Sequence, residues 1–151
     1  MMIELKRTSS EDTDFETLTG LLDQDLERRY PGTRDFFQPL NKIKLDAKAV
    51  VAYEDGKPVG CGCYREAAEG QTVEIKRMYV LDENRGRGIA GQVLRELETW
   101  AKEAGKKRAI LETGRGQPEA IALYTKSGYA EIDRYAPYTD REDSVCMGKD
   151  L

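Results

Sequence analysis

A glycine-rich segment, Arg85-Gly86-Arg87-Gly88-Ile89-Ala90, lies between a strand-like run at Val73–Val80 and a helix-like run at Gly91–Glu103. Small residues let backbone N–H groups approach a ligand closely. The first N–H groups of a helix have no partner inside the helix, and the positive end of the helix dipole lies at the same point. Together with the two arginines, these features predict an anion site suited to a phosphate or pyrophosphate.

The hydrophobic pattern around this segment predicts hairpins first and alternating helices and strands afterwards. Ser9 or Ser10 is expected to cap the first helix, and Asp55-Gly56 to turn the first hairpin. Residues 36–45 are less regular and are expected to hold a short helix or a loop. A mixed sheet flanked by helices, an α/β (α+β) fold, is the architecture that this order predicts. Strands are expected at Met2–Arg7, Ala49–Tyr53, Pro58–Arg65, Thr72–Val80, Arg108–Glu112, Tyr129–Ile132 and Ser144–Met147, and helices at Glu11–Tyr30, Ile89–Ala104 and from Pro118.

Length and charge narrow the class of protein. A chain of 151 residues is most simply one domain, residues 1–151. Lys and Arg number 24 against 28 Asp and Glu, for a net charge of −4, so no basic excess is present to neutralise the phosphates of a nucleic acid. No apolar run approaches the roughly 20 residues of a membrane span, and no signal peptide is evident. We therefore expect a cytoplasmic protein that binds neither nucleic acid nor membrane.

Few types of side chain in this sequence could act in catalysis or bind a metal. The chain has no histidine, which excludes histidine-based triads and histidine metal sites. Its cysteines, Cys61, Cys63 and Cys146, form a sparse, odd-numbered set that is typical of packed, reduced thiols. No metal site is expected, and proton transfer must use Glu, Asp, Tyr, Lys, Cys or water.

The glycines also fit the written form of the dinucleotide fingerprint. Gly86, Gly88 and Gly91 have the spacing Gly-x-Gly-x-x-Gly, and Glu112 follows about twenty residues later. A nicotinamide-dependent oxidoreductase is therefore an alternative. Two features oppose it, because residues 81–85 separate the strand from the first glycine, and the preceding half of the chain is a meander rather than a series of βαβ units. No Gly-Lys-Ser/Thr follows, which excludes a Walker-type loop.

Three segments instead resemble the GNAT superfamily of acyl-CoA-dependent N-acyltransferases. Arg85-x-x-Gly88-x-Ala90 is similar to the family's Gln/Arg-x-x-Gly-x-Gly/Ala signature, and Glu74–Val80 resembles its fourth strand. Gln117–Tyr129 resembles its Asn-x-x-Ala-x-x-Leu-Tyr-x-x-x-Gly-Phe segment, with Gln for Asn and Tyr for Phe. The resemblance implies a mixed, mostly antiparallel sheet of about seven strands, flanked by about four helices and splayed at the fourth strand.

The resemblance also implies acetyl-CoA as the acyl donor, with no metal. The loop would hold the pyrophosphate, and the free backbone groups of the fourth strand would pair with the pantetheine arm, much as an added strand pairs with a sheet edge. The implied coenzyme-binding residues are Met78, Tyr79, Val80, Arg85, Gly86, Arg87, Gly88, Ile89, Ala90, Gln117, Ala120 and Tyr124.

Acyl transfer to an amine needs a proton acceptor for the amine and a proton donor for the thiolate. Tyr124 falls on the family's tyrosine general acid. Glu74 precedes Arg85 by eleven positions, the spacing of the strand glutamate that acts as base in histone-acetylating members. Glu112 and a water molecule are the alternatives for the base. The backbone N–H of Met78 is the expected oxyanion donor.

The function implied is an N-acetyltransferase that moves acetyl from acetyl-CoA to a primary amine of a small molecule or peptide by direct attack. A non-catalytic acyl-CoA-binding domain of the same fold is the alternative. Dimers are common in this family, so a homodimer is a further expectation. Aromatic residues in segments that flank the family's acceptor site are candidates for substrate choice: Tyr30, Phe36, Phe37, Tyr135 and Tyr138.

Overall fold

The computed structural model describes residues 2–33, 36, 39 and 47–151, so most of the segment expected to be a short helix or a loop lies outside the described residues. These described residues form one seven-stranded sheet with the order β1-β2-β3-β4-β5-β7-β6, in which only the β4–β5 pair is parallel. This confirms the expected α/β class. The strands are β1 (Ile3–Ser9), β2 (Lys48–Glu54), β3 (Lys57–Glu66), β4 (Thr72–Val80), β5 (Arg108–Gly114), β6 (Ala130–Ile132) and β7 (Ser144–Asp150).

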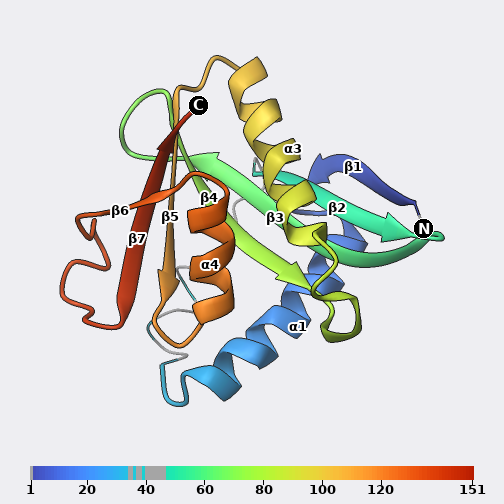
Figure 1. Ribbon diagram of the computed structural model, residues 1–151, viewed down its shortest axis with the longest axis horizontal. Coiled ribbons are helices and arrows are strands. Elements are labelled where there is room, and N and C mark those ends of the chain that lie inside the picture. Colours follow the sequence, from blue (N-terminus) through green and yellow to red (C-terminus); the bar gives the residue numbers. More distant parts are fainter. Residues whose placement is uncertain (1, 34–35, 37–38, 40–46) are drawn as a thin grey trace.

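Helices cover both faces of the sheet. The described residues contain three α-helices, α1 (Thr13–Arg29), α3 (Ile89–Glu103) and α4 (Pro118–Lys126), against about four expected, and a 3-10 turn at Asp82–Asn84. Figure 1 shows α3 in front of the sheet and α1 crossing behind it. The glycine-rich segment therefore connects the end of β4 to the start of a helix, as its sequence predicts.

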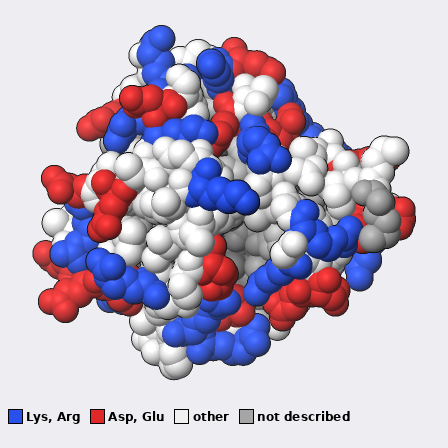
Figure 2. All heavy atoms as spheres, viewed as in Figure 1, with Lys and Arg blue, Asp and Glu red and all other residues white. Residues whose placement is uncertain are grey.

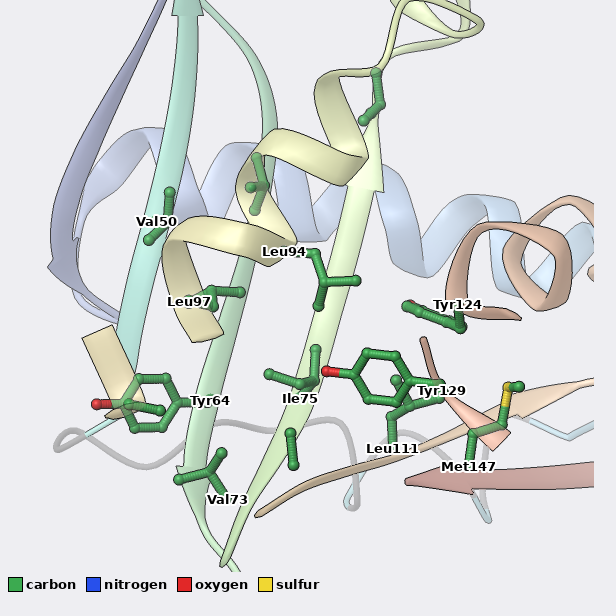
Figure 3. Packing of buried hydrophobic residues seen from close by; sticks show 14 of the residues in the cluster. Val50, Tyr64, Val73, Ile75, Leu94, Leu97, Leu111, Tyr124, Tyr129 and Met147 are labelled. Carbon is green, nitrogen blue, oxygen red and sulfur yellow. The ribbon is translucent and has the colours of Figure 1, made fainter. Parts of the chain in front are cut away.

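Two apolar clusters, one on each face, hold these layers together. On the α3 face, Leu94 and Leu97 are fully buried against Val50 and Ile75 of the strands (Figure 3). Burying a side chain of this size stabilises the fold by about 1.5–3 kcal/mol. On the α1 face, Phe15 and Leu18 pack with Ala49, Val51, Cys61 and Cys63. All three cysteines are buried and free, which confirms their expected role as packed thiols.

The N-terminus of α1 differs from the expectation. Asp12, not Ser9 or Ser10, is the N-cap, and its carboxylate accepts hydrogen bonds from the N–H groups of Asp14 and Phe15. The reason is that β1 continues to Ser9, where it still pairs with Lys48 of β2. The serine is thus part of the sheet, and the next side chain suited to capping begins the helix.

The sheet opens between β4 and β5. The two strands pair at only three positions, Thr72 with Arg108, Val73 with Ala109 and Glu74 with Ile110. Farther along, β4 carries a bulge in which two residues oppose Gly62 of β3, and one of them, Arg77, has a φ of 61°. A bulge bends its strand and increases the local twist, and β4 pairs with β3 again at Tyr79 and Val80. The expected splay at the fourth strand is confirmed, and Figure 1 shows the two strands diverging.

Candidate active site

A cavity of about 560 Å³ lies where β4 and β5 diverge. Its walls come from the C-terminal half of α1, the bulged part of β4, the end of β5, the residue before α4, the last turn of α4 and the start of β7. A cavity of this size at the open end of a sheet is typical of a small-molecule site. The side chains that matter most to its chemistry are Tyr30, Lys76, Met78, Glu112, Gln117 and Tyr124.

Tyr124 reaches this cavity from α4 and is only 7% exposed. Its ring meets that of Tyr129 edge to face, with 5.9 Å between centroids (Figure 3). Its hydroxyl has no hydrogen-bond partner among the described residues. Burial, and then the nearby charge of Glu112, raise the pKa of the phenol above its usual value. Tyr124 is therefore protonated at neutral pH and has a hydrogen to donate.

Glu112 faces the same cavity from β5. Its Oε2 accepts a hydrogen bond of 2.8 Å from the Ser144 hydroxyl on the neighbouring strand β7. Burial raises the pKa of this carboxyl to about 7, although the Ser144 hydrogen bond and the charge of Lys76 act in the opposite direction. A carboxyl that titrates near neutral pH can accept a proton from a substrate and release it again.

Glu74 lies elsewhere on β4 and is 5% exposed. Both of its oxygens are occupied, Oε1 by the guanidinium of Arg65 at 3.0 Å and Oε2 by the hydroxyl of Tyr135 at 2.9 Å. It is not among the residues that line the cavity. The structure thus brings Tyr124 together with Glu112, whereas Glu74 is held in an ion pair beside them.

The glycine-rich segment presents backbone donors rather than free arginines. Gly86 and Gly88 have φ angles of 78° and 79°, and a Cβ at either would meet nothing within 4 Å. The first helical hydrogen bond of α3 runs from Gln92 to Gly88, and no side chain caps the helix. The N–H groups of Ile89, Ala90 and Gly91 therefore have no partner among the described residues and suit a diphosphate.

Both arginines of this segment are engaged by the protein. Arg87 forms an ion pair with Glu54 of β2. Arg85 donates from Nε to the Val80 carbonyl at 2.9 Å, pairs with Asp82 and stacks on the ring of Tyr79. Their charge contributes to the local field, but direct contact with an anion would require them to leave these partners.

The remaining expected residues lie on α4 and the strand beside it. Gln117 is the residue before α4 and lines the cavity, where its side-chain amide donates to the Tyr30 hydroxyl at 3.4 Å. Ala120 packs against the main core. Met78 lines the cavity beside the bulge, and its sulfur fills the space that a Cβ on Gly62 would need.

Lys76 and Ser144 are two polar lining residues that the sequence analysis did not single out. Lys76 is 8% exposed and lines the cavity. Its position two residues after Glu74 on a strand, which places both side chains on one face, was the available signal. Ser144, the partner of Glu112, carries no signal that sequence alone reveals, because the pairing of β5 with β7 brings them together.

Comparison with known proteins gives the family. The model of the Acetyltransferase (GNAT) family matches residues 14–129. The chain belongs to the GNAT acetyltransferase family. The IAA acetyltransferase of Azospirillum brasilense is 37% identical over 131 residues, which cover 86% of each chain. This GNAT chain therefore shares most of its length with a named acetyltransferase.

Solved structures agree with this assignment. A Klebsiella pneumoniae protein whose name assigns it to the acyl-CoA N-acyltransferases has a TM-score of 0.82 at 33% identity, over 99% of this chain and 98% of its own. The PaiA N-acetyltransferase of Thermoplasma acidophilum, in complex with coenzyme A, has a TM-score of 0.74 at 22% identity and full coverage of both chains. At that identity the second likeness concerns the fold alone.

The surface of this GNAT domain carries mixed charge. Figure 2 shows acidic and basic side chains interspersed over the face that carries α3 and α4, with neither sign covering an extended area. In the part of the chain that the structure describes, every helix is too short or too polar to cross a lipid bilayer.

Proposed function

We propose that this chain transfers an acetyl group from acetyl-CoA to a primary amine, with Glu112 as the general base and Tyr124 as the general acid. The observation that carries the proposal is that a carboxyl with a pKa of about 7 and a protonated, unpartnered phenol line one cavity. Direct transfer needs these two proton-transfer groups and no covalent intermediate on the protein.

Acetyl-CoA would supply an activated acetyl thioester. The N–H groups of Ile89, Ala90 and Gly91 would hold its diphosphate. Among the described residues, no strand pairs with the bulged end of β4 on the β5 side, so its backbone around Met78 would pair with the extended arm of the coenzyme. An N–H group there would also stabilise negative charge on the thioester oxygen.

The side chains of the cavity would then move the protons. Glu112 would accept the proton that the amine loses as its nitrogen forms the new bond to carbon. Tyr124 would donate its proton to the sulfur as the carbon–sulfur bond breaks. Glu74 is the alternative base, but its ion pair with Arg65 and its hydrogen bond from Tyr135 leave Glu112 as the carboxyl better placed for this role.

The test is release of free coenzyme A thiol when the purified protein is mixed with acetyl-CoA and a panel of primary amines, with mass spectrometry of the acetylated product. We expect thiol release that requires both the protein and the amine. Binding of acetyl-CoA without thiol release for any amine would favour a non-catalytic acyl-CoA-binding domain and would contradict this proposal.

A further inference from the structure

The cavity contains side-chain donors with hydrogens that the described residues leave without acceptors. Lys76 is one of them. The residue is 8% exposed. Its ammonium group makes one hydrogen bond among the described residues, which it donates to the Tyr138 hydroxyl at 3.4 Å. No carboxylate of the described residues lies within 4 Å of Nζ. Burial lowers the pKa of Lys76, and the charges of Glu74 and Glu112 oppose this without either forming an ion pair with it. A ligand carboxylate at Nζ would favour the charged form.

Tyr30 is the second such donor. Its hydroxyl oxygen accepts hydrogen bonds from the Gly116 N–H at 3.1 Å and from the Gln117 amide at 3.4 Å. Both contacts use the oxygen as an acceptor, and the phenolic hydrogen has no acceptor among the described residues. The residue lines the cavity, so this hydrogen is available to a bound molecule.

Arg77 lines the same cavity, but its guanidinium is buried and already engaged by the protein. Its Nη2 donates to the Thr19 carbonyl and to the carboxylate of Asp23, while its buried Nη1 has no partner among the described residues. Asp23 is thereby engaged with a cation. The lining also carries the carboxylates of Glu27, Glu112 and Asp143, so the positive charge that an anion would meet is local to Lys76.

We propose that the acceptor is a small amino acid, whose free carboxylate binds to Lys76 and the Tyr30 hydroxyl while its amine faces Glu112. This inference rests on the proposed function and specifies its substrate class. Lys76 and Glu112 line the same cavity, so one small molecule that carries both an amine and a carboxylate can reach both side chains. A polyamine or an internal peptide segment would bring no anion to Lys76.

The experiment compares amino acids with their carboxamides as acceptors, for example glycine with glycinamide and leucine with leucinamide. The two members of a pair differ in the carboxylate and are nearly equal in size. The amine of a carboxamide is also less basic, so more of it is free to react at neutral pH, and chemistry alone would favour the carboxamide. We expect the wild-type kcat/KM to favour the carboxylate by at least about tenfold, the size of one charge-assisted hydrogen bond.

Lys76→Met tests the residue itself. We expect it to reduce the ratio of kcat/KM between carboxylate and carboxamide by about tenfold or more, chiefly through KM, with Lys76→Arg restoring part of the ratio. Lys102→Met, which removes an exposed lysine on α3, should leave the ratio unchanged and serves as the matched control. Tyr30→Phe should reduce the same ratio by a smaller factor.

The outcomes separate this inference from the proposed function. Acetylation of amines with no preference for the carboxylate, or an equal loss for both members of a pair in Lys76→Met, would overturn the assignment of the substrate class and leave the acetyltransferase proposal standing. Absence of thiol release with every amine of the panel, although acetyl-CoA binds by calorimetry, would contradict both.

Discussion

Glu112 of β5 and Tyr124 of α4 line one cavity, and the charge of the carboxylate helps to raise the pKa of the phenol. The phenol therefore binds its proton much more tightly than the carboxyl does. The carboxyl exchanges a proton near pH 7, whereas the phenol retains its own. A pair of titratable groups whose surroundings separate their pKa values is typical of an acid and a base that act in the same reaction.

Replacing Glu112 by Gln should remove the base. Because the carboxyl has a pKa of about 7, the fraction able to accept a proton rises with pH, and wild-type kcat/KM should rise through that value. In Glu112→Gln this limb should disappear and kcat should fall by about 10²- to 10⁴-fold. Steady-state rates between pH 5.5 and 9 measure both effects. Glu74→Gln is the control, and a limb lost in that variant but kept in Glu112→Gln would assign the base to Glu74.

The free energy of unfolding should also depend on the titration of Glu112, and it should fall as pH rises. A carboxyl whose pKa is raised to about 7 binds its proton more tightly in the folded state than in the unfolded state. The wild-type protein should therefore lose unfolding free energy as pH rises from about 4.5 to 7, by up to about 1.4 kcal/mol per pH unit from this group. Glu112→Gln should remove this slope. Urea unfolding of both proteins without ligand at pH 5.5 and pH 8 compares them, and parallel pH dependences would contradict the raised pKa.

Tyr124→Phe should slow turnover without loosening the coenzyme. The substitution removes only a hydroxyl that has no partner among the described residues, so the packing against Tyr129 is kept. We expect kcat to fall by about 10²-fold or more, with the Kd for acetyl-CoA within about twofold of wild type. Single-turnover thiol release and calorimetry provide the two readings. A normal kcat would remove Tyr124 from the mechanism.

Gly88→Glu should weaken coenzyme binding for two separable reasons. Gly88 has a φ of 79°, which strains any L side chain, and a carboxylate there would face the diphosphate. Gly88→Ala carries the backbone strain without the charge. We expect the Kd for acetyl-CoA to rise in both variants and to rise further in Gly88→Glu, with a difference that shrinks at high salt. Equal affinities in all three proteins would place the diphosphate elsewhere.

Gly114→Ala should displace Tyr30. A Cβ at residue 114 would lie 2.0 Å from the Tyr30 hydroxyl oxygen and 2.8 Å from Cζ, so the ring must move. Movement would break the contacts of Tyr30 with Gly116 and Gln117 and alter one wall of the cavity. We expect KM for the amine to rise several-fold with unchanged melting cooperativity. Gly70→Ala, where a Cβ meets nothing within 4 Å, is the control.

Sequence patterns predicted the strands and the loop well, because each depends on local periodicity or on a short motif, whereas the splay was implied by the resemblance to the GNAT superfamily. The position of the α1 cap depended instead on where β1 ends, which is fixed by pairing with β2. Ser9, Ser10 and Asp12 can all cap a helix, so the sequence near them does not show which one does. The strand pairing of β1 with β2 decides it.

The arrangement of the carboxylates was beyond sequence for a similar reason. Motif spacing favoured Glu74 over Glu112 as the base, and only the contacts of Arg65, Tyr135 and Ser144 favour Glu112 instead. Tyr30 is the same case, since its partners lie more than eighty positions away at the end of β5. Long-range contacts of this kind follow from the packing of α1 across the sheet and leave no periodic signal.

The three-position ladder between Thr72–Glu74 and Arg108–Ile110 leaves the two halves of the sheet joined at one end only. A bound pantetheine arm would act as a short surrogate strand and bridge the halves where the polypeptide does not. Bound coenzyme would then make the whole sheet more rigid. Amide hydrogen exchange in the distal parts of β4 and β5 would therefore slow as the fraction of enzyme with bound coenzyme rises.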